Sequence, residues 1–257
     1  MIKILTVSIV VVVIALLCAY RIRRRRIAAF AQRATFGSRS HHDAAFALGR
    51  AIFSGVKRGN DPIFVSRVLA PLGASPPRVL AEGGCCSGIN RLFITSLETL
   101  GIRSAQITVY RQPGPVGVHC LAQVQISGLS VIIDADYGVW FRHPNGGPIN
   151  IWQLRAGVPP TIERFVFDTE APYCDGKKTR PSGYPDRDYY QFDYSQTRTA
   201  NWSMSAFRRF AYRALNAVTN GRVNYLLLPP ILEWPEIILA ALLVVLALMC
   251  FVLGSML

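Results

Sequence analysis

Three side chains that together can activate a nucleophile follow one another along the chain: Cys86, His119 and Asp134. A thiol attacks as its thiolate, and a neighbouring imidazole can take the thiol proton while a carboxylate orients the imidazole. Cys86 also stands where a helix is expected to begin, and the positive end of a helix dipole lowers a thiol pKa. The residue types and their order therefore predict a cysteine nucleophile, a histidine base and an orienting acid.

The Gly83-Gly84 pair precedes two adjacent cysteines, Cys85 and Cys86. Glycines let the backbone turn sharply and let a substrate carbonyl approach main-chain N–H groups, which is one source of an oxyanion hole. Gln106 and Gln112 are the candidate side-chain donors to such a hole. Because Cys85 comes before the helix, we expect it to have a structural role.

The hydrophobic pattern predicts the elements that carry these residues. After Cys86, apolar residues recur at helical spacing, and Gly101 ends the helix. The pattern then changes to alternation, which is typical of strands that bury one face. We expect strands over residues 105–111, 119–126 and 129–134. The sequence thus places the thiol on a helix and both the imidazole and the carboxylate on a sheet.

Ser127-Gly128 predicts a two-residue turn between the second and third of these strands. In that register Asp134 lies opposite Leu121, and Asp136 lies opposite His119. Diagonal neighbours across a strand pair are within side-chain reach, so both aspartates are expected on the face of the imidazole. Asp134 is the predicted acid and Asp136 is the alternative.

A metal site and a bound cofactor are not expected. Zinc sites use paired Cys or His ligands at short spacing, and the sequence has neither a Cys-x-x-Cys nor a His-x-x-x-His pair. His41, His42 and His143 are expected at the surface, with His143 as the alternative base. The scattered cysteines do not form a disulfide framework and suit a reducing compartment, where a thiolate nucleophile stays usable.

The remaining chain is predicted in outline. We expect a polar connector over residues 27–42, a helix capped by Asp43 that runs to about Arg58, and a short helix over 64–72 closed by Gly73 and Pro76-Pro77. A strand is expected over 161–167, a long aromatic loop over 168–199, and an amphipathic helix over 202–218. That last helix is either interfacial or the final helix of the domain.

Two uncharged apolar runs, residues 4–20 and 237–257, predict membrane spans. Arg21 and Arg23 to Arg26 follow the first run at once, which favours an uncleaved anchor over a signal peptide. Basic residues precede the second run and none follows it. By the positive-inside rule, we expect a two-span protein of the bacterial inner membrane with its domain in the cytoplasm.

The formal net charge of +13 would also suit nucleic-acid binding. Much of the basic excess lies beside the apolar runs, however, where anionic lipid head groups attract it, and no basic stripe interleaved with aromatic residues is present. We therefore expect membrane lipids, a peptide, amide or acyl substrate and a membrane protein as partners, and no nucleic acid.

Residues 83–137 resemble the transglutaminase-like superfamily of papain-type cysteine enzymes. The similar segments are GGCCSGINRLFITSLETLGI, in which the cysteine opens a helix, and HCLAQVQI with VIIDADYG. The Gly-Gly-x-Cys start, Asn90 and the Asp-x-x-Tyr-Gly ending also resemble arylamine N-acetyltransferases. The resemblance implies that Cys86 is the nucleophile, His119 the base and Asp134 the orienting acid. In place of the aromatic and acidic residues common after the histidine, this chain has Leu121 and Gln123.

The sequence therefore predicts an α+β fold with helices packed on an antiparallel sheet, in three parts: an anchor over residues 1–26, a transglutaminase-like domain over 27–228 and a second span over 229–257. The predicted function is a membrane-anchored cysteine enzyme that cleaves or transfers an amide or acyl group through a thioester. Hydrolysis and acyl transfer both remain open, because the acceptor decides between them. The alternative is a catalytically idle scaffold of an envelope or polysaccharide assembly complex.

Overall fold

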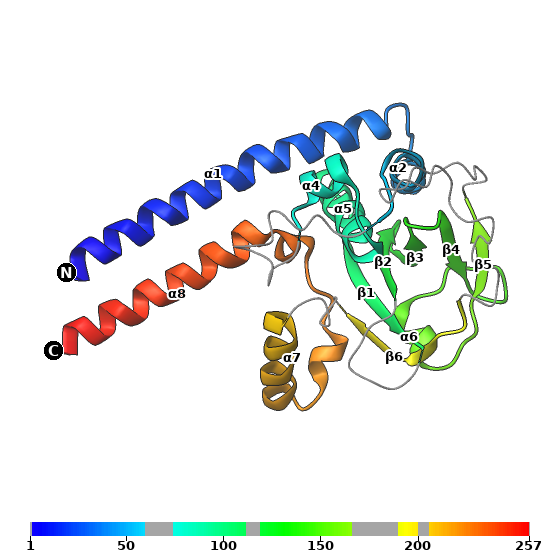
Figure 1. The fold of residues 1–257 in the computed structure, drawn as a ribbon. Coiled ribbons are helices and arrows are strands. Elements are labelled where there is room, and N and C mark those ends of the chain that lie inside the picture. The colour runs from blue at the N-terminus through cyan, green and yellow to red at the C-terminus, as the bar shows by residue number, and fades with distance from the viewer. Residues whose placement is uncertain (1, 60–73, 112–118, 166–189, 200–205, 257) are drawn as a thin grey trace.

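A computed structural model describes residues 2–59, 74–111, 119–165, 190–199 and 206–256. It is a mixed α+β fold around a six-stranded antiparallel sheet with the order β5-β4-β3-β2-β1-β6. In Figure 1, α2, α4 and α5 lie over one face of the sheet and α6 lies at the other. The strands are β1 (Ser104–Tyr110), β2 (His119–Ile126), β3 (Leu129–Asp134), β4 (Val139–Arg142), β5 (Thr161–Arg164) and β6 (Asp193–Thr199). The helices are α1 (Ile2–Ala34), α2 (His41–Gly55), α4 (Pro76–Glu82), α5 (Cys86–Thr99), α6 (Ile151–Arg155), α7 (Ala206–Thr219), η3 (Arg222–Tyr225), η4 (Pro230–Glu233) and α8 (Pro235–Met256).

The β2-β3 hairpin has the register that the two-residue turn predicts, with Ala122 opposite Ile133 and Ile126 opposite Leu129. Ser127 and Gly128 both have positive φ, of 50° and 81°, as a tight hairpin turn of primed type requires. Since the strands run antiparallel, the start of β2 and the end of β3 meet at one end of the sheet. His119 and Asp134 are the residues at those two positions.

Both faces of the sheet are buried, each in its own core. Ala122 and Val124 of β2 pack with α1, α2 and α5, while Leu121 packs with Tyr137, Phe141 and α6 on the other side. The expectation of a single apolar face on β2 was therefore too simple. Gln123, on the second face, is buried and accepts a hydrogen bond from the Ile151 N–H at 2.9 Å.

Helices α1 and α8 lie side by side and leave the domain in the same direction, so that both chain ends are at their far end (Figure 1). Both helices are long and apolar enough to cross a membrane. α1 is unbroken to Ala34, which corrects the predicted connector over 27–42 and carries the helix across the predicted boundary at residue 26. The reason is that Ile27 and Ala31, one helical turn apart, are fully buried against the domain core.

Several local predictions need correction. α2 is capped by Ser40, whose side chain accepts from the Asp43 N–H at 3.0 Å, and it ends at Gly55 and not at Arg58. Pro76-Pro77 begins a helix because proline suits the first turn, whereas we expected a break there. β6 occupies the end of the predicted 168–199 loop, and β4 and α6 were not predicted. The predicted 64–72 helix lies outside the described residues. Within the described parts of 161–167 and 202–218, the structure has β5 (Thr161–Arg164) and α7 (Ala206–Thr219).

A buried ion cluster ties the helix of Cys86 to the base of α8. The Glu233 carboxylate binds Arg91 of α5, with Nε to Oε2 at 3.0 Å, and Arg208 of α7, with a guanidinium nitrogen to Oε2 at 2.9 Å. Arg91 also donates to the Ala74 carbonyl at 2.6 Å. Burial opposes ionisation of Glu233, but the charges of Arg208 and Arg91 lower its pKa. Glu233 is thus a charged link between three helices.

We predict that Glu233→Gln lowers the free energy of unfolding by roughly 3 kcal/mol, because two buried guanidinium groups lose their counter-charge. The loss is measured by melting of the detergent-solubilised protein. Since the folded-state pKa of Glu233 is lowered, the stabilisation exists above the unfolded-state pKa and disappears as the pH falls through the folded-state pKa. The difference in free energy of unfolding between wild type and Glu233→Gln therefore becomes smaller in acid.

Glu163→Gln is the matched control, because Glu163 pairs with Arg142 at an exposed position and its loss should hardly change the melting temperature. Equal melting of both variants would contradict the prediction.

Candidate catalytic site

The structure brings Cys86, His119 and Asp134 to one end of the sheet. Cys86 is the first residue of α5, His119 the first of β2 and Asp134 the last of β3. His119 Nε2 lies 2.6 Å from Asp134 Oδ2, and both side chains are buried. The Cys86 thiol forms a hydrogen bond with the His119 ring. Because Nε2 is engaged by the carboxylate, Nδ1 is the nitrogen left for the sulfur.

Both oxygens of the Asp134 carboxylate are held. Oδ1 accepts the backbone N–H groups of Asp136 at 2.9 Å and Tyr137 at 3.3 Å, while Oδ2 also accepts the Tyr190 hydroxyl at 2.9 Å. Burial alone would raise the pKa of Asp134, but the charge of His119 and these hydrogen bonds lower it. The carboxylate is therefore ionised and fixed in orientation beside the imidazole.

Aromatic rings hold the imidazole of His119 in place. The Phe192 ring is nearly parallel to it, with an interplanar angle of 9° and centroids 6.2 Å apart, and the Tyr137 ring lies 5.5 Å away. Burial works against a charged ring, but the Asp134 carboxylate and the Cys86 sulfur outweigh it and raise the pKa of His119 well above its ordinary value. The imidazole is thus a strong base in a nearly water-free setting.

The pKa of the Cys86 thiol is raised, which is opposite to the direction that the helix N-terminus and the imidazole predict. The largest cause is a hydrogen bond with Cys120 that favours the neutral thiol, and burial acts in the same direction. Hydrogen bonds with Cys85 and His119, and the charge of His119, lower the pKa of Cys86, but their combined effect is smaller. Sequence reasoning missed Cys120 because neighbouring strands and helices, not chain position, bring the two sulfurs together.

The start of α5 is fixed to the sheet by side-chain amides. Asn90 donates to the carbonyls of Cys86 at 3.0 Å and Cys120 at 2.7 Å, so it joins the first turn of the helix to β2. Gln106 of β1 donates to the Ser87 carbonyl at 2.9 Å. Gln106, a candidate oxyanion donor in the sequence, therefore supports the helix, whereas Gln112 lies outside the described residues.

The glycine pair shapes the approach to Cys86. Gly83 ends α4 with a φ of 92°, a conformation that favours glycine. The Gly84 N–H donates to the Lys57 carbonyl at 3.1 Å and its carbonyl accepts from the Gly59 N–H at 3.0 Å. The Gly84 N–H is thus already occupied. The first N–H groups of a helix have no partner within the helix, and the N-cap residue Cys85 makes no side-chain cap, so those of α5 are the candidate oxyanion donors.

The alternative residues lie in other settings. Asp136 is buried, but its Oδ2 pairs with Arg58 Nε at 3.1 Å. The Arg58 guanidinium also lies 4.2 Å from the centroid of the Tyr137 ring, where it stabilises the turn after Asp134 by a cation–π contact. His143 belongs to an exposed turn, in which its Nδ1 accepts from the Asn145 N–H at 3.3 Å. The geometry therefore pairs His119 with Asp134 and not with Asp136. It also places His119, and not His143, beside Cys86.

Tyr190 and Phe192 are site residues that sequence reasoning did not identify. They lie within the predicted aromatic loop over 168–199, in which the sequence predicted no site residue. Both also border a cavity of about 760 Å³ between α6, β5 and the start of β6. Within the part of the chain that the structure describes, no group of three or more His, Cys, Asp or Glu side chains is arranged to hold a metal ion.

The comparisons with known proteins add little to this geometry. No protein-family model matches the chain, and no curated protein matches it. Among solved structures, it is similar to a candidate protease from Parabacteroides distasonis ATCC 8503, at 16% identity and a TM-score of 0.35. The match covers 46% of this chain and 26% of that protein, so the chain spans about a quarter of its length. Because this similarity is so low, it carries no argument about family or mechanism.

We predict that alkylation of Cys86 by iodoacetamide becomes faster as the pH rises through and beyond the ordinary thiol range, because the raised pKa leaves the resting sulfur protonated. Site-resolved mass spectrometry of the full chain measures the rate. Cys120→Ala removes the bond that favours the thiol and should speed alkylation at neutral pH. Cys85→Ala removes a bond that favours the thiolate and should slow it. A rate that is already constant below neutral pH would show a preformed thiolate and contradict the prediction.

Proposed function

We propose that this protein is a membrane-anchored, transglutaminase-like cysteine enzyme that cleaves or transfers an amide or acyl group through a thioester. Cys86 is the nucleophile, His119 the general base and Asp134 the acid that orients the base. The observation that carries the proposal is the buried His119–Asp134 contact of 2.6 Å, with the Cys86 thiol hydrogen-bonded to the same ring. A buried carboxylate–imidazole pair aimed at a thiol at a helix N-terminus is the arrangement that cysteine acyl chemistry requires.

The proposed reaction begins with transfer of the Cys86 proton to His119 as the sulfur attacks the substrate carbonyl. The carbon–sulfur bond forms, and the negative charge moves to the carbonyl oxygen beside the first N–H groups of α5. The intermediate then collapses with loss of the leaving amine or alcohol, which takes the proton from the imidazolium. A thioester on Cys86 remains. Water, or another acceptor activated by His119, cleaves this thioester and restores the thiol.

The pKa values of the site indicate when the proton moves. The raised pKa of Cys86 favours the neutral thiol, and the raised pKa of His119 favours the imidazolium paired with Asp134. The resting site therefore carries both protons and becomes reactive when one of them is lost. In that reactive form one proton is shared between the sulfur and the His119 ring, and the adjacent carboxylate stabilises the imidazolium.

Anchoring by α1 and α8 is part of the proposal. Tyr20 and Trp234 meet edge to face with centroids 5.2 Å apart, and Arg23 pairs with Glu236 one residue into α8. Trp234 is fully buried against the domain, so the arginines that follow the apolar run of α1 mark the membrane boundary, as is typical of such segments. The clustered arginines lie on the domain side of that boundary, which supports a cytoplasmic domain with both chain ends across the membrane.

A catalytically idle scaffold is the second candidate, and the raised pKa of Cys86 favours it. A thiol that shares its hydrogen with Cys120 is less nucleophilic at neutral pH than a thiolate. In that case the domain would present its surface to partners of an assembly complex without turnover. Detection of an acyl-enzyme distinguishes the two functions.

We predict that purified full-length protein, incubated with a panel of activated amide and ester donors and quenched in acid, acquires a covalent acyl adduct on Cys86. Intact-protein and peptide mass spectrometry report the mass and the position of the adduct. Cys86→Ala abolishes it, while Cys85→Ala retains it and controls for general thiol reactivity in the same turn. An adduct that persists in Cys86→Ala refutes the nucleophile assignment. A wild-type protein that forms none with any donor supports the scaffold.

We predict that Asp134→Asn slows acyl-enzyme formation by roughly 10⁴-fold, because the amide cannot stabilise the imidazolium and favours the wrong tautomer. Asp136→Asn is the matched control, since the same change two residues away alters the Arg58 pair and leaves the imidazole contact intact. Single-turnover rates of protein with unchanged melting test this difference. Equal slowing by both variants would indicate that the turn, and not the Asp134 charge, matters.

A further inference from the structure

Helix α7 presents an apolar strip to solvent. Phe210 is 70% exposed and Val218 is 85% exposed, and exposed Ala214 lies between them at helical spacing. Large apolar side chains with this exposure are unusual on a helix that already packs against its own domain. This surface, which we call the α7 strip, therefore needs a partner.

The opposite side of α7 is firmly held by the domain. Arg208 binds the buried Glu233 carboxylate, and the Tyr212 ring lies 4.6 Å from the guanidinium carbon of Arg198 on β6. Tyr212 and Ala211 pack against the fully buried Val223 of η3. The orientation of the helix is thus fixed, and the α7 strip must face away from the sheet.

The charge beside the α7 strip is basic. Arg209 and Arg213 are exposed along one border of the strip, and Arg222 is exposed in η3 just beyond the helix. Within α7 no acidic residue offsets them. An apolar strip bordered by arginine is the pattern of a helix that lies in the interface of an anionic membrane.

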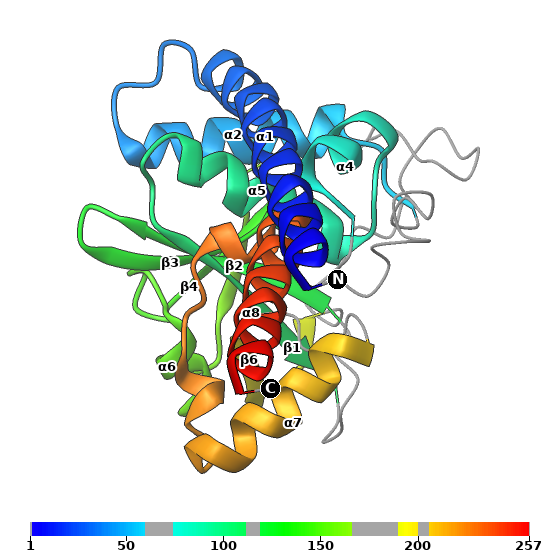
Figure 2. The ribbon, with the colours of Figure 1, turned by 90° about the vertical axis from the view of Figure 1, so that its left-hand side faces the viewer.

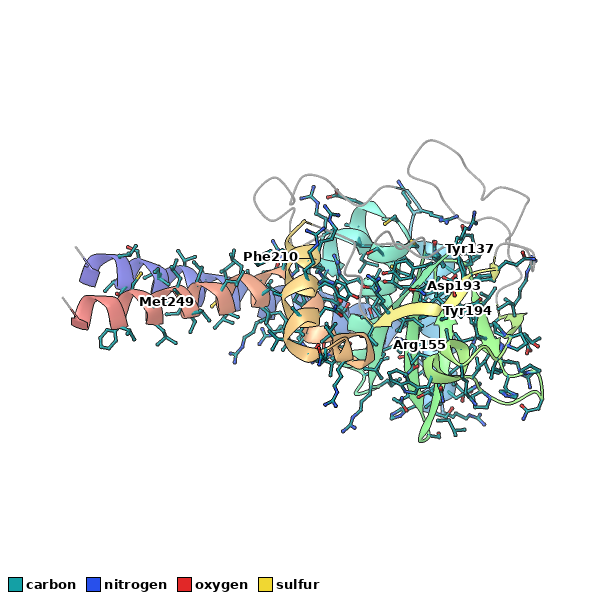
Figure 3. The ribbon with its side chains drawn as sticks, turned by 90° about the horizontal axis from the view of Figure 1, so that it is seen from below. Tyr137, Arg155, Asp193, Tyr194, Phe210 and Met249 are labelled. Carbon is teal, nitrogen blue, oxygen red and sulfur yellow. The ribbon has the colours of Figure 1, made fainter. Side chains whose placement is uncertain are left out.

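The position of α7 in the fold agrees with this pattern. Arg208, in the first turn of α7, pairs with Glu233. Glu233 lies two residues before Pro235, where α8 begins, so this pair holds α7 close to the start of α8. Figure 2 looks from the free ends of α1 and α8 toward the domain, and α7 lies there in front of the sheet and runs across the direction of the two helices. Figure 3 places Phe210 at the end of the domain from which α1 and α8 emerge, with Arg155 and Tyr194 farther away. Exposed Leu226, Leu227 and Ile231 lie in the segment that joins α7 to α8.

We propose that α7 is a membrane-surface helix whose strip of Phe210, Ala214 and Val218 enters the interface of an anionic bilayer while Arg209 and Arg213 bind lipid phosphates. This inference rests on the proposed anchoring by α1 and α8. The two helices bring the domain to the bilayer, and α7 fixes its tilt. The end of the domain that carries α7 then faces the lipid.

The test places the photo-crosslinker p-benzoylphenylalanine at position 210 or 218 of the full-length chain, reconstituted in phosphatidylcholine vesicles with or without phosphatidylglycerol. Mass spectrometry after irradiation identifies lipid adducts. The control position is Trp152, an exposed apolar residue on α6, far from the spans (Figure 1). We expect strong lipid adducts at both α7 positions in vesicles with phosphatidylglycerol, fewer without it, and few at position 152 under either condition.

Charge reversal supplies a second measurement. Arg209→Glu with Arg213→Glu should reduce the lipid adducts at position 218 by roughly tenfold in anionic vesicles. The matched control, Arg39→Glu with Arg50→Glu, changes net charge equally at exposed positions outside α7 and should leave the adducts unchanged. The two double variants must have the same melting temperature, so that a difference in lipid adducts does not come from unfolding.

Crosslinks from α7 to a second copy of the chain, or lipid adducts no more frequent than at position 152, would overturn the proposal. Resistance of the same samples to alkaline extraction from the vesicles reports the anchoring separately. Protein that stays in the vesicles without α7 adducts therefore refutes the membrane-surface helix alone. Protein that is extracted refutes the anchoring on which it rests.

Discussion

The buried negative charge of Asp134 is the constraint around which the candidate site is built. A carboxylate in this position requires several donors, and it has four: the imidazole, two backbone N–H groups of the following turn and the Tyr190 hydroxyl. The four donors come from three structural requirements. The β2-β3 register supplies the imidazole, the turn supplies the amides, and the segment before β6 supplies the hydroxyl. The fold of this end of the sheet is therefore also the means of keeping one side chain ionised.

The helix of the nucleophile is held at two points with different physical characters. At its first turn, the neutral amide of Asn90 joins it to β2. One residue later, the buried charge of Arg91 joins it to Glu233 at the base of α8. Successive residues on a helix point in different directions, so a neighbouring pair can bind the sheet on one side and η4 on the other. The position of Cys86 thus depends on both the sheet and the segment that precedes α8.

The hairpin and the nucleophile helix could be predicted from the sequence because their signals are local. Ser127-Gly128 fixes a two-residue turn, and the turn fixes the register that brings Asp134 to His119. The continuation of α1 past the arginines could not be predicted, since it depends on the burial of Ile27 and Ala31 against distant residues. Tyr190 and Cys120 were missed for the same reason. Their contacts join segments far apart in the chain, and no spacing rule indicates them.

The same distinction explains why the pKa of Cys86 departs from expectation. A helix N-terminus and a nearby imidazole are local features, and both favour a thiolate. The hydrogen bond to Cys120 is a tertiary contact, and together with burial it outweighs them. The raised pKa of His119 favours an imidazolium beside Asp134, so the resting site is a neutral thiol next to an imidazolium–carboxylate pair. Asp134 therefore stabilises a charged ring before any substrate binds, and the site must lose one proton before the sulfur can attack.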